Sequence, residues 1–598
     1  MTILKSKNKQ MKKIIATLLL LNTFTVIQAQ RLENKIPENV DVLISANAEN
    51  LFKLINVSDI DNNALGKEIL KDLNRDYNIY KVESHVKEEG SKEKQEEVKR
   101  TVSSVANAGV NITENAYYFL TKTDSVSYHN FYVELNDRKT FESLLYEREK
   151  RKLKKEGDYS YIAGRSSFKI WNDHTLLLVN GSMSTTFFSD NKERLEKLKE
   201  EGEYNYNFKR RLAREWSKEH GLNIFDKNYS RSIASNSKFQ KSKKKNSSAT
   251  LWVRNYGELM TDIFKSFGNS FYPLYAEGNQ NVYGVEEVTA NLFFEKEDAR
   301  VLLDMAVSSD MKRSFKKIYN KRMDRNLVNS FDHDKALAFW SISLNTEETL
   351  KQYPELVNKM YGGILPKFQE EIEIVGDLFS LVIDEKAIGE LITGDALLVL
   401  NDFAKKEVEY TTYEYDKNYK RKEVTKTKED FVPDFTLMIG SEKEDLLNKF
   451  YRIGEKHKAV KIQDNVVEFV TKKADLPFGL YSVVKNNVLY LTTSKTGALN
   501  IANGTTNFNT KKHSKLVRNN STVLYVDVNA VLNKVPSKWM SKSEKEALHF
   551  STENMNDALF RVSRMKGNTI SSELKLSTQG TEENTLKLLL KFINSVAK

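Results

Sequence analysis

The chain has 598 residues, of which 40% are hydrophobic and 29% charged, and its formal net charge is +11. This composition is ordinary for a globular protein and excludes a disordered or fibrous chain. The chain has no cysteine, which excludes disulfides, a thiol nucleophile and the lipid-bearing cysteine of a bacterial lipoprotein. Lysines and glutamates are interleaved over most of the chain, as expected of solvated surface, so we expect no nucleic-acid partner.

The N-terminus carries a targeting signal. Two lysines after Met11 precede an apolar run over residues 14–21, and the segment ends at Ala29. A positive start, a short apolar run and a small residue at the exit predict a secretory signal peptide over residues 1–29, whereas a spanning helix needs about 20 apolar residues. We expect an exported protein, periplasmic, at the cell surface or secreted, that does not span a membrane. Both Met1 and Met11 fit as the translation start.

The same order of strand and helix patterns occurs twice. The first set comprises an alternating strand over residues 130–135, a helical pattern over 139–145 and a hairpin over 167–179, and the second has the same patterns over 434–439, 443–447 and 480–492. Each set is preceded by a strand that leads into a helix, and is followed by a hairpin and a helical pattern. Short strands joined in hairpins and followed by helices are typical of α+β architecture.

We therefore predict an α+β fold of two tandem, similar halves, residues 30–325 and 326–598. Each half is expected to contain antiparallel or mixed sheets, with units that resemble a split βαβ arrangement, packed by helices. The alternative is that two unrelated α+β segments share part of their strand order by chance. Alternation along the strands predicts that Phe131, Val133, Leu177, Val179, Leu437, Ile439, Leu489 and Leu491 face inward.

Two segments interrupt the repeat. Residues 186–248 form a helical and basic insertion in the first half, in which leucines recur at three- and four-residue spacings. Residues 405–428 form a protruding hairpin in the second half. The lysine-rich residues 238–245 lack interleaved aromatics, and we interpret them as a basic linker rather than a site for an acidic polymer. We expect residues 87–100 and 235–248 to be mobile, because neither segment has enough apolar surface to offset the entropy of ordering.

The sequence has no motif that specifies a reaction. It contains no phosphate-binding loop, no His-Glu-x-x-His helix and no G-x-S-x-G elbow. Ser182 follows a strand but lacks the second glycine that would turn the chain into a helix, so we interpret it as part of a polar loop.

The most metal-like cluster is Asp332, His333 and Asp334. Adjacent residues on an extended chain point to opposite sides, so they cannot all bind one ion, although one or two could join ligands from elsewhere. We interpret the cluster as a polar turn. Carboxylates are too numerous for the sequence to single out an acid and base pair. We therefore assign no catalytic, cofactor-binding or metal-binding residue, and expect no cofactor.

Three segments carry a family resemblance: the opening over residues 36–47, the run over 115–120 and the strand-helix unit over 131–145. With the signal peptide, they make the chain similar to exported Bacteroidota proteins that are grouped only as a domain of unknown function. The similarity extends over most of the mature chain at the level of pattern. Members commonly carry a lipidated cysteine, which this chain lacks, and the family brings no catalytic residues.

These observations lead to two hypotheses. The leading one is a noncatalytic exported cell-envelope protein that binds a partner protein or a glycan through its two similar halves. The alternative is a hydrolase that acts on envelope glycans or peptides at a site between the halves, where pockets preferentially form. A flat apolar patch would favour binding, whereas a cleft with two close carboxylates of opposed pKa shifts would favour the hydrolase.

Overall fold

The computed structural model describes residues 32–74, 102–257, 284–361, 369–415, 420–470, 478–534 and 541–596. The predicted signal peptide and the predicted linker over residues 87–100 lie outside these ranges. The chain packs as two compact units, of which unit 1 consists of Met1–Phe52 and Gly66–Lys245, and unit 2 of Lys53–Leu65 and Asn246–Lys598. The division in packing therefore comes before the predicted repeat boundary at residue 325.

Unit 1 is built on an antiparallel sheet with the strand order β1-β2-β3-β7-β6-β5-β4. Its strands are β1 (Val42–Ala46), β2 (Ala116–Lys122), β3 (Val126–Glu134), β4 (Lys154–Glu156), β5 (Tyr159–Ala163), β6 (Ser167–Trp171) and β7 (Thr175–Met183). Its helices include η1 (Leu32–Lys35), α2 (Ala48–Phe52), α5 (Arg138–Ser143), α6 (Glu147–Lys150), α7 (Thr185–Asp190), α8 (Lys192–Glu196), α9 (Asn205–Ile224) and α10 (Ser237–Ser242). The hairpin predicted over residues 167–179 is confirmed as β6 and β7.

Helix α9 packs closely on β6 and β7 because a glycine stands at each of two points of contact. A Cβ atom at Gly221 would lie 2.2 Å from Cδ1 of Phe168, and one at Gly181 would lie 2.6 Å from Oγ of Ser217. Neither position has room for a side chain. The predicted insertion thus supplies a helix that covers part of the sheet in unit 1.

The predicted mobile linker over residues 235–248 is wrong. The segment contains α10, whose Phe239 side chain is fully buried. Asn236 caps the helix by accepting from the backbone of Lys238 and Phe239, and Lys243 pairs with the buried Glu33 at 2.7 Å. A single aromatic anchor and one buried acidic partner therefore hold a segment whose composition is that of a linker.

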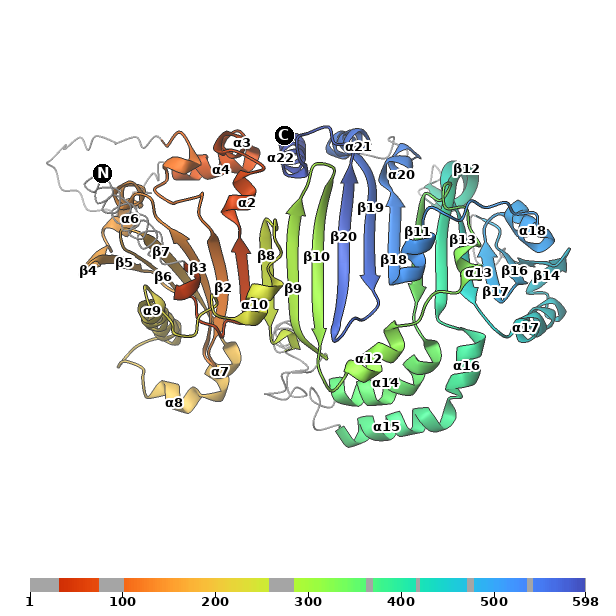
Figure 1. The fold of residues 1–598 in the computed structure, drawn as a ribbon, viewed down its shortest axis with the longest axis horizontal. Coiled ribbons are helices and arrows are strands. Elements are labelled where there is room, and N and C mark those ends of the chain that lie inside the picture. The colour runs from red at the N-terminus through yellow and green to blue at the C-terminus, as the bar shows by residue number, and fades with distance from the viewer. Residues whose placement is uncertain are drawn as a thin grey trace, which may run out of the picture. The chain divides into compact units, whose positions relative to one another are not determined.

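Unit 2 contains a longer antiparallel sheet, with the order β8-β9-β10-β20-β19-β18-β11-β12-β13-β17-β16-β15-β14. Its central strands lie side by side in Figure 1. The strands are β8 (Ala249–Arg254), β9 (Val285–Phe294), β10 (Asp298–Val307), β11 (Ala338–Ser343), β12 (Asp395–Tyr415), β13 (Arg421–Gly440), β14 (Val460–Gln463), β15 (Val466–Phe469), β16 (Tyr481–Lys485), β17 (Val488–Thr492), β18 (Asn520–Asp527), β19 (Met555–Ser563) and β20 (Thr569–Thr578). Both units combine antiparallel sheet with helices, so the predicted α+β class is confirmed.

Helices of unit 2 lie mainly beyond the two ends of the central strands. In Figure 1, α12, α14 and α15 lie beyond one end, and α20, α21 and α22 beyond the other. Their bounds, with those of the remaining helices, are α3 (Val57–Asp61), α12 (Lys312–Tyr319), α13 (Arg325–Val328), α14 (Thr346–Tyr361), α15 (Gln369–Val382), α16 (Glu385–Leu391), α17 (Glu444–Lys456), α18 (Lys495–Asn503), α19 (Ser514–Asn519), α20 (Val528–Lys534), α21 (Lys542–Asn554) and α22 (Thr585–Val596). A further helix, α4 (Ala64–Leu73), contains the boundary between the units. Each described helix is too short or too polar to cross a membrane.

Hydrogen bonds of asparagine side chains join the first and the last segment of unit 2 in the sequence. Asn63 donates from Nδ2 to the carbonyl of Leu590 at 2.7 Å, and Asn594 accepts the backbone N–H of Ala64 at 2.7 Å. Asn584 donates to the carbonyl of Leu54 at 2.8 Å. The segment Lys53–Leu65 is thus held by the C-terminal helix α22.

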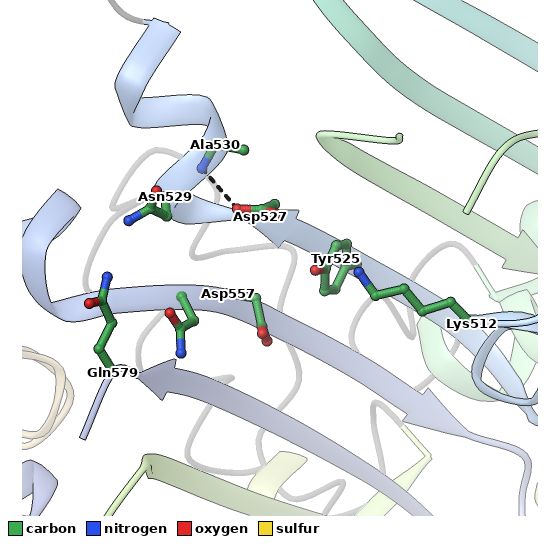
Figure 2. Close-up of a pocket in the computed structure, with 8 residues that line it drawn as sticks. Lys512, Tyr525, Asp527, Asn529, Ala530, Asp557 and Gln579 are labelled. Carbon is green, nitrogen blue, oxygen red and sulfur yellow. Dashed lines mark hydrogen bonds between the residues drawn. The ribbon is translucent and has the colours of Figure 1, made fainter. Parts of the chain in front are cut away.

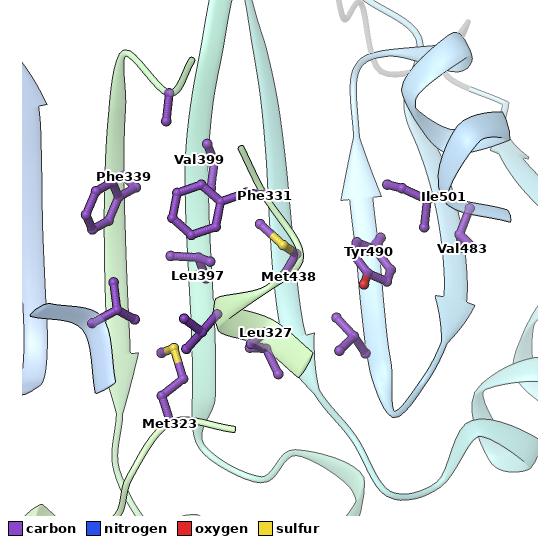
Figure 3. Packing of buried hydrophobic residues seen from close by; sticks show 14 of the residues in the cluster. Met323, Leu327, Phe331, Phe339, Leu397, Val399, Met438, Val483, Tyr490 and Ile501 are labelled. Carbon is purple, nitrogen blue, oxygen red and sulfur yellow. The ribbon is translucent and has the colours of Figure 1, made fainter. Parts of the chain in front are cut away.

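The main core of unit 2 lies on one face of its sheet (Figure 3). Phe339, Leu397, Val399, Met438 and Val523 are fully or almost fully buried there. The core extends to residues of α13, α18 and α19, including Leu327, Val328, Ala498, Ile501 and Val517. These three helices therefore pack on that face.

The predicted inward positions are only partly right. Val133, Leu177 and Val179 are buried, but Phe131 is 40% exposed. In unit 2, the four predicted positions Leu437, Ile439, Leu489 and Leu491 are only partly buried, while their neighbours Met438, Val488 and Tyr490 belong to the core. Alternation separates the two faces of a strand, but it cannot say which face is covered when both are apolar.

The predicted hairpin over residues 405–428 is confirmed. β12 and β13 pair in register as far as Tyr415 and Arg421. β12 pairs with β11 only between Asp395 and Leu400, so the outer part of the hairpin is a two-stranded ribbon within the described strands. The guanidinium of Arg421 lies 3.3 Å from the ring centroid of Tyr413 near its end.

The covered and uncovered faces can be distinguished by truncating two adjacent leucines on β12. Leu397 is fully buried and Leu398 is 37% exposed. We expect Leu397→Ala to lower the free energy of unfolding by about 2–5 kcal/mol, and Leu398→Ala to lower it by about 1 kcal/mol or less. Urea denaturation followed by circular dichroism, at a concentration low enough to keep the chain monomeric, measures both changes. Equal losses would contradict the assignment of faces.

Candidate functional site

Ser182 does not lie in a loop, contrary to our interpretation. β7 continues to Met183, and Ser182 pairs across the sheet with Ser127. Gly181 beside it is needed for the approach of α9, as described above. The Asn-Gly-Ser sequence that suggested a reactive serine is therefore explained by helix packing against a strand.

Asp332, His333 and Asp334 form a hydrogen-bonded turn. His333 is 1% exposed, its Nε2 lies 2.9 Å from the carbonyl of Val328, and its Nδ1 accepts the backbone N–H of His513 at 3.0 Å. Asp332 accepts the backbone N–H of Asp334 at 3.1 Å, and Asp334 accepts from the side chain of Asn509. The two hydrogen bonds of His333 fix its ring as the Nε2–H tautomer. Among the described residues, no group of three or more His, Cys, Asp or Glu side chains is arranged to hold a metal ion.

One candidate site is a polar pocket of about 450 Å³ at one end of β18 and β19. It is lined by Lys512, Tyr525, Asp527, Asn529, Ala530, Asn556, Asp557 and Gln579. Asp527 ends β18 and accepts the backbone N–H of Ala530 at 2.8 Å, which caps α20 (Figure 2). Asp527 and Asp557 face each other directly across the two strands. The sheet register thus brings two carboxylates into one pocket.

The pocket is richer in hydrogen-bond acceptors than in donors. The side-chain amide nitrogens of Asn529, Asn556 and Gln579 donate to backbone carbonyls. Each of these amides keeps a second N–H, while the two aspartates offer only acceptor oxygens when they are ionised. The other donors in the lining are the Lys512 ammonium and the Tyr525 hydroxyl. Burial, together with the charges of Asp557 and Asp527, raises the pKa of Tyr525 to about 12, so its hydroxyl stays protonated at neutral pH.

The second candidate is the face of the unit 2 sheet opposite the core, which we call the apolar face. Its central row runs across nine paired strands as Leu292, Val301, Leu574, Phe560, Leu524, Trp340, Leu398, Leu437 and Leu491. A parallel row consists of Ala290, Leu303, Ser572, Val562, Thr522, Ile342, Ala396, Ile439 and Leu489. The row on the other side consists of Phe294, Ala299, Leu576, Ala558, Val526, Ala338, Leu400 and Phe435.

Every position of the apolar face is hydrophobic except Ser572 and Thr522, and none is charged. None of these side chains is fully buried. The largest exposures include Leu574 at 53% and Trp340 at 47%. Burial on β11 alternates along the strand, because Phe339 and Ser341 are buried on either side of the exposed Trp340. At the margins, Val562 packs against a cluster that includes Phe315 of α12, and Tyr451 of α17 bonds to Ser482 beside Leu491. The described residues thus leave the middle of this face uncovered.

The opposite face carries charge where the core ends. Glu573 on β20 is 7% exposed and pairs with Arg561 on β19 at 2.5 Å. Arg300 on β10 lies 3.8 Å from Glu573 and 3.0 Å from Asp298. Over these strands the charges are therefore paired on the face away from the apolar rows.

Sequence reasoning found neither candidate. Asp527 and Asp557 lie on β18 and β19, and the register that sets them opposite each other depends on pairing over 30 residues of chain. The apolar face had a visible signal, because several strands are apolar at successive positions rather than at alternate ones. Such strands are expected to be covered on both faces.

Comparisons with known proteins identify no relative. No family model and no curated protein matches the sequence. A solved structure of TP0453 in crystal form I is similar at 10% identity, over 47% of this chain and 81% of that chain, with a TM-score of 0.22. TP0453 in crystal form III is similar at 9% identity, over 49% of this chain and 88% of that chain, with a TM-score of 0.19. Similarity at these TM-scores supports no conclusion about fold or function.

The paired histidines predict an acid-sensitive unit 2. Burial, with the charge of Lys512, lowers the pKa of His513 to about 4, and burial lowers that of His333. Because the unfolded chain binds more protons below about pH 6.5, this contribution to stability is complete above pH 6.5 and is lost as the pH falls toward 4. Thermal unfolding between pH 4 and 7 should show a shallower pH dependence in His513→Gln than in wild type.

His549→Gln is the matched control, since His549 lies on α21 with its side chain 74% exposed. It should keep the wild-type dependence on pH. An unchanged slope in His513→Gln would contradict the assignment.

Proposed function

We propose that this protein is a noncatalytic, exported cell-envelope protein that binds a partner protein through the apolar face of unit 2. The observation that carries the proposal is a face of three uncharged rows, whose middle the described residues leave uncovered. Rows on one face are two residues apart, or about 6.8 Å, and strands are about 4.8 Å apart. With one full width counted for each strand and each row, nine strands and three rows span about 43 Å by 20 Å, or roughly 880 Å². The largest apolar patch of a monomeric protein is typically about 300–600 Å².

The chemistry of this face favours a protein over a glycan. Hydroxyl groups of a sugar would lose their hydrogen bonds to water on a surface that offers almost no polar atoms, and unpaired polar groups are costly to bury. Apolar side chains of a partner protein would gain from the same contact. The predicted signal peptide, and the resemblance to exported Bacteroidota proteins, support a location in the cell envelope.

We further infer that the chain consists of two tandem, similar halves. The order β1-β2-β3-β7-β6-β5-β4 in unit 1 has the same form as β11-β12-β13-β17-β16-β15-β14 in unit 2. β8, β9 and β10 also form a run of paired neighbours, as do β18, β19 and β20. Shared order across ten strands supports duplication better than chance similarity, although identities between the halves are few.

Capture from native envelope extract tests the binding function. The full-length chain, immobilised through a C-terminal tag, should retain partner proteins that the double variant Trp340→Glu, Phe560→Glu loses, because two charges would then have to be buried. Tyr206→Glu is the matched control: it replaces an aromatic that is 64% exposed on α9 of unit 1 and so does not belong to this face. Equal capture by wild type and the double variant would contradict the proposal.

The polar pocket supports a hydrolase as the second candidate. Side chains directly opposite on antiparallel strands have Cβ atoms about 4.5–5.5 Å apart, and retaining glycosidases place their two carboxyl groups about 5–5.5 Å apart. The purified protein would then hydrolyse envelope glycans, and Asp527→Asn and Asp557→Asn would each reduce turnover at least 100-fold. The matched control is Asp173→Asn, at an exposed turn of unit 1. Absence of turnover with wild-type protein would exclude this candidate.

A further inference from the structure

We propose that the occupant of the apolar face is a second copy of this chain, so that two unit 2 sheets pack face to face. The inference rests on the proposed binding function and names its partner. It predicts a homodimer with the three apolar rows of each copy buried against those of the other.

The composition of the face favours a second copy over an unrelated protein. Interfaces between proteins that also exist apart are only about as apolar as the remaining surface, at roughly 56–58% nonpolar area, whereas homodimer interfaces are more apolar, at roughly 65%. Here Ser572 and Thr522 are the polar positions in three rows across up to nine strands, in a chain of which 29% is charged. With no charges to select a foreign surface, the face is complementary to another uncharged sheet.

Geometry supports the same occupant. Stable interfaces bury about 800 Å² per partner, which is close to the roughly 880 Å² estimated above from strand and row spacing. Twisted sheets pack face to face at about −30° and about 10 Å apart. Two copies of one sheet have the same twist, so their rows can stay in contact over several strands.

The side chains at the centre suit an interface that forms its own core. Trp340, Leu524 and Phe560 are direct neighbours in the central row, and each is at least 37% exposed. Aromatic residues at the middle of an interface commonly dominate its binding energy. On the opposite face of neighbouring strands, Arg561 and Glu573 already form an ion pair, so that face offers no equivalent surface.

Sedimentation velocity of the full-length chain tests the proposal. We expect wild type to be dimeric at micromolar concentration, and Leu524→Glu and Trp340→Glu each to weaken the dimer at least 100-fold while circular dichroism stays unchanged. Tyr206→Glu should remain dimeric. Because the chain has no cysteine, a spin label on Ser572→Cys reports only this face, and label-to-label coupling is expected there but not from a label on the exposed Ser143→Cys of unit 1.

The outcomes separate this inference from the proposed function. A wild-type monomer at 100 μM whose capture of a different protein is abolished by the double variant Trp340→Glu, Phe560→Glu would overturn the second copy and leave the binding function intact. A monomer with no face-dependent capture would overturn both. Co-sedimentation of wild type with phosphatidylethanolamine and phosphatidylglycerol vesicles, lost in Trp340→Glu, would overturn the second copy in favour of lipid.

Discussion

The unit 2 fold depends on the alternation of successive side chains between the two faces of each strand. Because side chains alternate between the two faces of a sheet, a row that pairs across one strand boundary stays on the same face across the next. On one face this rule collects Phe339, Leu397, Met438 and Val523 into the core. On the other face it collects Trp340, Leu398 and Leu524 into a surface. One register therefore fixes both the core and the candidate interface, and a shift of one residue in any strand would exchange them.

The two candidate sites differ in whether their side chains have partners before anything binds. In the polar pocket, the amide nitrogens of three lining side chains are already bonded to the backbone, and these bonds form without a ligand. The apolar face is different, since its side chains remain in contact with water until something covers them. Burial of apolar area stabilises by about 25 cal/mol per Å², so covering this face would contribute more free energy than any contact in the pocket.

Hairpins could be predicted from the sequence more accurately than the buried face of each strand or the contacts between distant strands. The hairpins at β6-β7, β16-β17 and β12-β13 were predicted because alternation and turn residues act within a few positions. Phe131 was predicted to face inward but is 40% exposed, whereas its neighbour Tyr132 is fully buried. Leu437 was placed on the wrong face because both faces of β13 are apolar, and only the packing of helices such as α13 and α18 decides that Met438 is buried. Asp527 and Asp557 could not be paired from the sequence, because their contact depends on the register of two strands. Residues 235–248 were predicted to be mobile from their composition, but the single buried ring of Phe239 holds this segment in place.

The amide contacts between Lys53–Leu65 and helix α22 determine when unit 2 can be completed during synthesis. Its first segment is held by Leu590 and Asn594 near the end of the chain, and β10 pairs with the last strand, β20. Contacts between residues far apart in the sequence are slow to form, because the entropy of closing a long loop is lost before any contact stabilises it. Unit 2 can therefore be completed only after its last helix has been made. Until then β10 lacks one of its two neighbouring strands, and Lys53–Leu65 lacks the helix that holds it.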